Sequence, residues 1–240
     1  MAALLVTGTD TGIGKTVVTA AIGAALAARG VHVAVAKPAE TGCAPDPEDA
    51  LALRAAAGDP SPIDAVCPWR LPEPLAPSLA AERAGVRIDV DALMVHLRAR
   101  AEQADVLLIE GAGGLLVPLT ATTSFADLAG RLPARVVVVV GSRLGAINHA
   151  LLTLEVLERR GIAVSGYVVN ELGPADDLAV ATNDGLLRGL TTARHLGTVP
   201  WTPDAPGLLA ALRGAGSAAD TARQRLAALG AALDLDALTH

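Results

Sequence analysis

A run of glycine, hydroxyl and lysine residues early in the chain has the composition of a phosphate-binding loop. Residues 8–16 read Gly-Thr-Asp-Thr-Gly-Ile-Gly-Lys-Thr, after a short aliphatic segment and before a long Ala-rich one. Glycines let backbone N–H groups point inward around phosphate oxygens, and the start of a helix adds positive potential there. Lys15 would then reach the β and γ phosphates of a nucleotide, and the Thr16 hydroxyl would bind magnesium. These residues predict a site for ATP and Mg²⁺.

The loop closely resembles a P-loop, with one departure from the strict pattern. That pattern places its first glycine where Thr9 stands, and Gly8 comes one residue earlier. A glycine turn that merely joins a strand to a helix is the simpler alternative, which the Gly-Lys-Thr ending disfavours. A dinucleotide-binding turn would need a third glycine where Val17 stands, so a dehydrogenase is disfavoured as well.

A second lysine, Lys37, lies at the end of the next predicted strand. Lys15 and Lys37 are the two lysines among 19 basic residues, so arginine is the usual cation of this chain. A lysine retained against that bias suits a place that needs a compact point charge, such as the neighbourhood of a phosphate. Because ligands gather at the carboxyl ends of parallel strands, Lys37 could stabilise a phosphoryl group during transfer. Taken alone, Lys37 could equally be a solvated residue at the rim of the sheet.

Two carboxylates complete the set of candidate site residues. Glu110 ends the apolar run 106–109 and is followed by Gly-Ala-Gly-Gly, which lets the chain pass close to a ligand. A carboxylate at that place suits a magnesium ligand of a nucleotide site. Asp49 opens a short predicted helix, where an acidic residue is favoured by the helix dipole without any further role.

Strand-like and helix-like segments alternate along the chain. Short aliphatic runs are separated by longer Ala/Leu segments of helical spacing. We predict strands over residues 3–7, 32–37, 106–110, 135–141, 164–170 and 196–199. We predict helices over residues 15–29, 49–57, 89–103, 124–132, 146–160 and 177–190, and two more after Pro206. Apolar strands such as residues 136–140 are typical of a parallel sheet buried on both faces. The predicted fold is α/β and P-loop NTPase-like, with a mostly parallel central sheet flanked by helices on both faces.

The arrangement of these elements predicts one domain over residues 1–240. No internal repeat and no linker interrupts the alternation. The Pro-rich interval 59–77 is expected to be a long irregular loop, and residues 203–240 an Ala-rich helical segment.

Composition excludes several classes of function. Hydrophobic residues make up 52% of the 240 residues, which excludes intrinsic disorder. The net charge of -6 and the four aromatic residues disfavour a nucleic-acid partner. Cys43 and Cys67 are too few for a disulfide framework and match no zinc pattern, so we expect buried or incidental thiols. No apolar run reaches the ~18 residues of a membrane span, and no basic segment marks a secretory signal, so a cytoplasmic protein is expected.

Five segments together resemble the dethiobiotin synthetase family, whose members are ATP-dependent carboxylases that close the ureido ring in biotin synthesis. The resemblance runs in order from residue 1 to about residue 202 and includes the variant form of the P-loop. Its segments are residues 8–16, Lys-Pro-Ala-Glu-Thr-Gly at 37–42, Asp-Ala-Leu-Ala-Leu at 49–53, Glu-Gly-Ala-Gly-Gly at 110–114 and Leu-Gly-Ala-Ile-Asn-His at 144–149.

The resemblance implies a reaction and a role for Lys37. One amine of 7,8-diaminononanoate captures CO2 as a carbamate, and the carbamate oxygen attacks the γ-phosphate of ATP. The second amine then closes the ring with loss of phosphate. Lys37 would be the catalytic residue, holding carbamate and γ-phosphate together by charge.

The resemblance also implies binding residues and a homodimer. Magnesium would be bound by Thr16, Asp49 and Glu110. Substrate would be bound by Thr41 and, across the dimer interface, by the segment Leu144, Gly145, Ala146, Ile147 and Asn148, where a helix start suits a carboxylate. ATP would contact Thr11, Gly12, Ile13, Gly14, Lys15, Thr16, Val17, Asp49, Glu110, Gly111, Ala112, Gly113, Asn170, Pro200, Trp201 and Thr202. Asn170 is the residue that would read adenine. The match ends after Thr202, and Gly207 stands where some members carry a carboxylate.

Three alternatives belong to other classes. A nucleotide-dependent switch of the partition or metallochaperone kind commonly carries a second lysine near the start of its P-loop, and residues 8–10 contain none. A cobyrinate-type amidotransferase needs a glutaminase domain, for which 240 residues leave no room. A pure binding protein would not explain Lys37, Thr41 and Glu110 together on one sheet edge.

Overall fold

A six-stranded parallel sheet forms the centre of the molecule. The computed structural model describes residues 2–43 and 45–239. The strand order is β2-β5-β1-β6-β7-β8, and each neighbouring pair runs parallel. The strands are β1 (Ala2–Gly8), β2 (Val33–Ala36), β5 (Val106–Gly114), β6 (Arg135–Ser142), β7 (Val164–Glu171) and β8 (His195–Val199). The predicted parallel sheet is confirmed.

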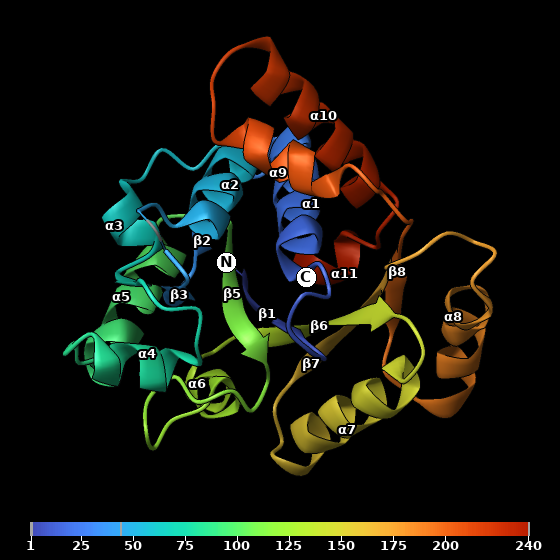
Figure 1. Ribbon diagram of the computed structural model, residues 1–240, viewed down its shortest axis with the longest axis horizontal. Helices are drawn as coiled ribbons and strands as arrows, with labels where there is room; N and C mark the ends of the chain where they lie inside the picture. Colours follow the sequence, from blue (N-terminus) through green and yellow to red (C-terminus); the bar gives the residue numbers. More distant parts are fainter. Residues whose placement is uncertain (1, 44, 240) are drawn as a thin grey trace.

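Helices cover both faces of this sheet (Figure 1). One face carries α1 (Lys15–Ala28), α2 (Glu48–Ala57), α9 (Ala205–Leu212) and α10 (Ser217–Ala231), and the short helices α3 (Ile63–Val66) and α11 (Asp236–Thr239) pack on the same core. The other face carries α4 (Pro77–Arg83), α5 (Val90–Glu102), α6 (Phe125–Arg131) and α7 (Ala146–Arg159). Helix α8 (Leu178–Leu190) lies beside α7 near the β8 edge. The predicted covering of both faces is therefore confirmed.

A hydrophobic core lies on each face of the sheet, and successive residues of the strands belong alternately to one core and the other. Leu4 and Val6 of β1 belong to the core under α1, whereas Leu5 between them belongs to the opposite core. The all-valine stretch of β6 divides in the same way, with Val137 and Val139 on one side and Val138 on the other. Successive side chains of a strand point to opposite faces, so a sheet covered on both sides needs apolar residues at every position.

The interval 59–77 is more ordered than the sequence predicted. It contains α3 and the short strand β4 (Trp69–Leu71), which pairs in parallel with β3 (Ala39–Thr41). The Lys37 N–H also donates to the carbonyl of Val66 at 2.8 Å. The prediction of an irregular loop was wrong because these strands depend on each other across 30 residues of chain, and three-residue strands leave no periodic pattern.

Helix α10, near the end of the chain, packs on α1, the helix that follows the glycine loop. Two helices were predicted after Pro206, whereas the structure has α9, α10 and the additional short helix α11. Helix α10 crosses α1 so closely that a Cβ atom placed on Gly230 would lie 2.1 Å from the carbonyl oxygen of Ala21. Among the described residues, no helix is long and apolar enough to cross a membrane.

Candidate active site

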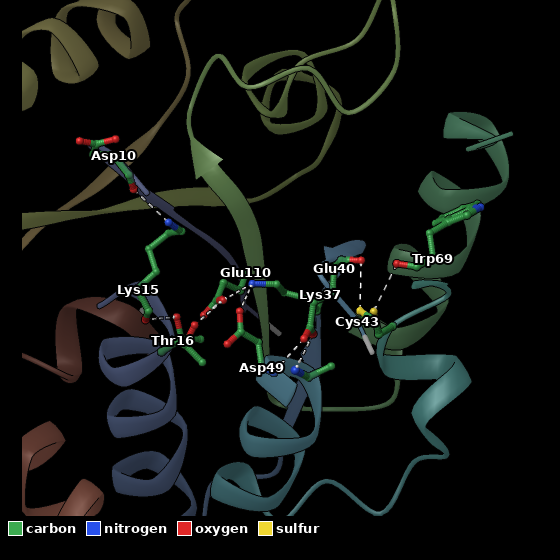
Figure 2. Close-up of polar contacts among 12 residues, drawn as sticks. Asp10, Lys15, Thr16, Lys37, Glu40, Cys43, Asp49, Trp69 and Glu110 are labelled. Atoms are coloured by element: carbon green, nitrogen blue, oxygen red, sulfur yellow. Dashed lines mark hydrogen bonds and ion pairs between the residues drawn. The ribbon is translucent and has the colours of Figure 1, made fainter. Parts of the chain in front are cut away.

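The register of three adjacent strands brings the candidate residues to one edge of the sheet. Ala36 of β2 is paired with Ile109 of β5, so the residues that follow them, Lys37 and Glu110, come side by side. On the other side of β5, Glu110 is paired with Val6 of β1, just before the glycine loop. Figure 2 shows the resulting cluster, with Thr16, Lys37, Asp49 and Glu110 pointing toward one another. Parallel pairing therefore gathers residues that lie far apart in sequence.

Lys37 lies between two carboxylates and is 3% exposed. Its Nζ donates to Oε1 of Glu110 and, at 2.9 Å, to Oδ2 of Asp49. Burial alone would lower the pKa of Lys37, but the charges of Glu110 and Asp49 outweigh burial and raise the pKa above its ordinary value. Burial would likewise raise the pKa of Asp49, and the Lys37 ammonium keeps it below its ordinary value. Lys37 is therefore a cation held in place, which suits charge stabilisation better than proton transfer.

The oxygen atoms around Lys37 fit a magnesium ion. The Thr16 hydroxyl donates to Oε1 of Glu110 at 3.0 Å. The Lys37 ammonium donates to the same oxygen and to Asp49, so the two carboxylates lie on either side of it. Glu110 Oε2 is buried and has no hydrogen-bond partner among the described residues. A buried carboxylate oxygen without a partner can accept a cation, and hydroxyl and carboxylate oxygens are the ligands that Mg²⁺ prefers. Only two carboxylates meet here, and the described part of the chain holds no group of three or more His, Cys, Asp and Glu side chains that could hold a metal, so the Thr16 hydroxyl would have to be the third ligand.

The glycine loop has the backbone that a phosphate cradle needs. Gly12 and Gly14 adopt φ angles of 72° and 79°, the left-handed region that other residues rarely enter, and α1 begins directly after Gly14. The stem of Lys15 lies across Gly8, where an added Cβ would be 3.0 Å from its carbon atoms. Lys15 Nζ donates to the carbonyl of Asp10 at 3.2 Å, and burial, with Lys37 nearby, lowers the pKa of Lys15. The start of α1 and the Lys15 side chain therefore line one cavity.

A cavity of about 400 Å³ opens over these groups. It is lined by loop and helix residues predicted for ATP and by residues predicted for catalysis, metal and substrate. They are Thr11, Gly12, Gly14, Lys15, Thr16, Val17, Lys37, Thr41, Asp49, Glu110, Ala112 and Gly113. Leu209 of α9 and Glu40 of β3 also line it, and sequence analysis assigned neither of them a role.

A second cavity of about 250 Å³ adjoins the first, since both include Gly12, Gly14 and Val17. Asn170, Trp201 and Thr202, predicted to contact the base, line this second cavity. The Asn170 amide donates to the carbonyl of Ile13 at 2.9 Å, so it also anchors the glycine loop. Pro200 accepts a hydrogen bond from the Thr202 hydroxyl at 2.9 Å within the same turn. The predicted sites for the phosphates and for the base of ATP would therefore form one continuous groove along the two cavities.

Several predicted residues lie outside both cavities. Ile13 is buried in the core below the loop, and Gly111 packs against the ring of Phe125. The segment 144–148 lies at the start of α7, with Leu144 91% exposed. The N–H of Ala146, expected to bind a carboxylate, donates to the Arg143 carbonyl at 3.1 Å. Within one copy of the chain, this segment therefore lines neither the cavity at Lys37 nor the one at Asn170.

Glu40 makes a contact that its sequence position did not indicate. Its carboxylate accepts the N–H groups of Asp49 and Ala50, at 3.0 and 2.9 Å. Burial and the nearby charge of Asp49 raise the pKa of Glu40 to about 7, and Lys37 and the two amides oppose that rise. No periodicity or spacing signal links residue 40 to residue 49, because the contact depends on how β3 and α2 pack.

Fold and site together define a P-loop nucleotide-binding α/β protein. A family model described as an AAA domain matches residues 2–206. The ATP-dependent dethiobiotin synthetase BioD of Anaeromyxobacter dehalogenans (strain 2CP-C) is 44% identical over 205 residues, covering 85% of this chain and 92% of that protein. The protein of the same name from Xanthomonas axonopodis pv. citri (strain 306) is 44% identical over 209 residues, with the same coverage. The chain belongs to the ATP-dependent dethiobiotin synthetase family, and the protein is accordingly an ATP-dependent ligase.

Solved structures of lower identity share the fold. The MinC:MinD cell division protein complex of Aquifex aeolicus superimposes with a TM-score of 0.58 at 17% identity, covering 96% of this chain and 95% of that chain. The cell division ATPase MinD of Pyrococcus furiosus gives a TM-score of 0.56 at 21% identity, with coverage of 95% and 98%. These likenesses confirm the P-loop NTPase-like architecture.

Proposed function

We propose that this protein carboxylates 7,8-diaminononanoate with CO2 and closes the ring to dethiobiotin, converting ATP to ADP and phosphate in a magnesium-dependent reaction. The observation that carries the proposal is the placement of Lys37, a buried cation in the cavity that the glycine loop also lines. The carbamate and the γ-phosphate are both anionic, so negative charges are brought together as the bond between them forms. A fixed cation at their junction lowers the energy of the transition state without taking up a proton.

Each reactant has a candidate binding group on the same edge of the sheet. The amides after Gly12 and the Lys15 ammonium would bind the phosphates, and Asn170 with Trp201 would hold the base. Thr41 lines the cavity beside Lys37 and would contact the diamine. With the reacting groups bound side by side, the enzyme supplies mainly proximity and charge.

The residues Thr16, Asp49 and Glu110 would hold Mg²⁺, which supplies positive charge to the phosphate oxygens when bound. When Mg²⁺ binds these carboxylates, the Lys37 ammonium, which otherwise contacts both of them, would turn toward the phosphate while its buried stem stays in place. Lys37 freed from those carboxylates would be available to the γ-phosphate and the carbamate.

A homodimer would bring the segment 144–148 of one copy to the cavity of the other. Three leucines support an interface on this side of the molecule: Leu116 and Leu152 are 53% exposed and Leu144 is 91% exposed. A cavity of about 570 Å³, lined by residues of α7 and of the turn after β5, lies next to the glycine loop at Thr11. Leu116 and Leu152 line this cavity, and exposed leucines at such a place are typical of a surface that another chain covers. The reaction draws on ATP and bicarbonate, so the cytoplasm is the compartment we propose.

The test is ADP release from Mg-ATP and bicarbonate, measured with and without 7,8-diaminononanoate. The proposal predicts release that depends on the diamine and stops when Mg²⁺ is chelated. Slow ATP hydrolysis that ignores the diamine would contradict it and favour a nucleotide-dependent switch protein.

A further inference from the structure

Glu40 caps helix α2 from a different element of the fold. Helix α2 begins at Glu48, and the N–H groups of its first residues have no acceptor within the helix. The residue before it, Pro47, has a side chain without an acceptor. Glu40 of β3 supplies both carboxylate oxygens instead, Oε1 to the N–H of Asp49 and Oε2 to the N–H of Ala50. The start of α2 is therefore fixed by a buried carboxylate that is 6% exposed.

This contact holds the main chain of Asp49, the residue whose carboxylate reaches Lys37. The side chain of Asp49 is 41% exposed, so packing alone does not hold it. Its main chain is held by Glu40 on one side, and its Oδ2 reaches Lys37 Nζ on the other. Glu40 is three residues beyond Lys37 on the same segment. This short stretch of chain therefore carries both the Lys37 ammonium and the carboxylate that holds the main chain of Asp49.

We propose that Glu40 is a positioning residue for the metal and phosphate site, because it fixes the start of α2 and thereby the carboxylate of Asp49. This inference rests on the proposed magnesium role of Asp49. A side chain that orients a metal ligand contributes to metal affinity without touching the ion, and its loss typically costs about ten- to a hundred-fold in affinity.

The experiment measures Mn²⁺ binding in place of Mg²⁺, by electron paramagnetic resonance with a non-hydrolysable ATP analogue. Glu40→Ala is expected to weaken Mn²⁺ binding about ten-fold or more. Glu40→Gln keeps the shape and an acceptor for one of the two amides, so it should weaken Mn²⁺ binding by a smaller factor. It is also the variant to use where Glu40→Ala does not fold.

The chain offers a matched control in Asp89. This residue also accepts two amides at a helix start, the N–H groups of Asp91 and Ala92 at 3.0 Å each, but from the N-cap position of its own helix α5, and it lies outside the nucleotide cavities. Asp89→Ala removes a two-amide cap and should lower the melting temperature while Mn²⁺ affinity stays at the wild-type value. Loss of Mn²⁺ affinity in Asp89→Ala equal to that in Glu40→Ala would reduce Glu40 to a purely structural role and overturn the inference.

A double-mutant cycle with Asp49→Asn separates positioning from other effects. If Glu40 acts through Asp49, Glu40→Ala adds little further loss of Mn²⁺ affinity once Asp49 is replaced. Additive losses would contradict the inference. The readout is metal binding, so it does not depend on the diamine. A wild-type protein without diamine-dependent turnover would refute the proposed reaction and leave the metal-binding result intact.

Discussion

Lys37 and Glu110 form an ion pair that solvent hardly reaches, between the ends of neighbouring strands 73 residues apart in sequence. Their side chains are 4% and 0% exposed. A buried ion pair contributes little net stability, since desolvation offsets most of the attraction, and removing one partner leaves an uncompensated charge. Under the proposed function, this pair would serve the reaction rather than the stability of the fold.

The first prediction concerns turnover in Lys37→Ala. Removing the cation takes away charge stabilisation of the transferring phosphoryl group but leaves the glycine loop and Lys15 in place. We expect turnover to fall by at least about 10²-fold. Binding of a fluorescent ATP analogue should stay near the wild-type value. Near-normal turnover in this variant would remove Lys37 from the mechanism.

The second prediction concerns a buried ion pair outside the site. Asp59 accepts hydrogen bonds from Arg100, at 2.6 Å, and from the N–H of Val35 at 2.9 Å, so it ties α5 to β2. Asp59→Ala should lower the free energy of unfolding by about 3–5 kcal/mol, because Arg100 is left buried without its partner. The measurement is urea denaturation. Asp91 also lies on α5, and Asp91→Ala breaks its exposed pair with Arg131 of α6, so this variant should cost under about 1 kcal/mol.

The effect of Asp59 on stability should also depend on pH. Burial would raise the pKa of Asp59, but its hydrogen bonds and Arg100 outweigh burial and hold the pKa below the ordinary 3.8. A carboxyl group with a lowered pKa stabilises the fold above its unfolded-state pKa and loses that contribution as the pH falls. The stability gap between wild type and Asp59→Ala should therefore narrow below pH 3.8. A gap that widened there would contradict the assignment.

The third prediction concerns the two thiols. Burial, together with the nearby charge of Glu40, raises the pKa of Cys43 to about 11 and that of Cys67 to about 12. The thiolate is the reactive form, so both thiols should resist a disulfide reagent at pH 8 in the native protein. Both should react at once in guanidinium chloride. Fast reaction of the native protein would show that one thiol is exposed.

The fourth prediction concerns the crossing of α10 and α1. Gly230→Ala places a Cβ atom 2.1 Å from the backbone of Ala21 and should destabilise the protein by about 1–3 kcal/mol. Gly185→Ala is the matched control, a glycine inside α8 whose added Cβ meets no atom of the described structure within 4 Å. It should stabilise by about 0.5–1 kcal/mol because alanine favours a helix. Equal effects in both variants would argue against close packing of α10 on α1.

Local sequence patterns were enough to predict which candidate residues lie at the carboxyl ends of the parallel strands. The glycine loop, the aliphatic strands and the position of Lys37 are short-range features, and parallel pairing places strand ends together. Sequence reasoning therefore predicted that Lys15, Lys37 and Glu110 would share one edge, and the structure confirms that placement. Apolar periodicity likewise predicted α7 and β6 to within about two residues.

The parts that were missed depend on contacts between distant, weakly patterned segments. The strand β4 exists because β3 offers it a partner, and neither is long enough to show alternation. Glu40 looked like an ordinary residue of a motif because its role arises only when α2 begins beside it. Leu209 reaches the cavity because α9 packs against α2, and the sequence around it shows only helical spacing.

The measurement that tests the proposed reaction most directly is mass spectrometry of the product formed from carbon-13 bicarbonate, ATP, Mg²⁺ and 7,8-diaminononanoate. The proposed reaction predicts dethiobiotin that carries the heavy carbon in its ureido group, is formed with ADP in equal amount, and is missing in the Lys37→Ala variant. ADP formed without any labelled cyclic product would contradict the proposed reaction.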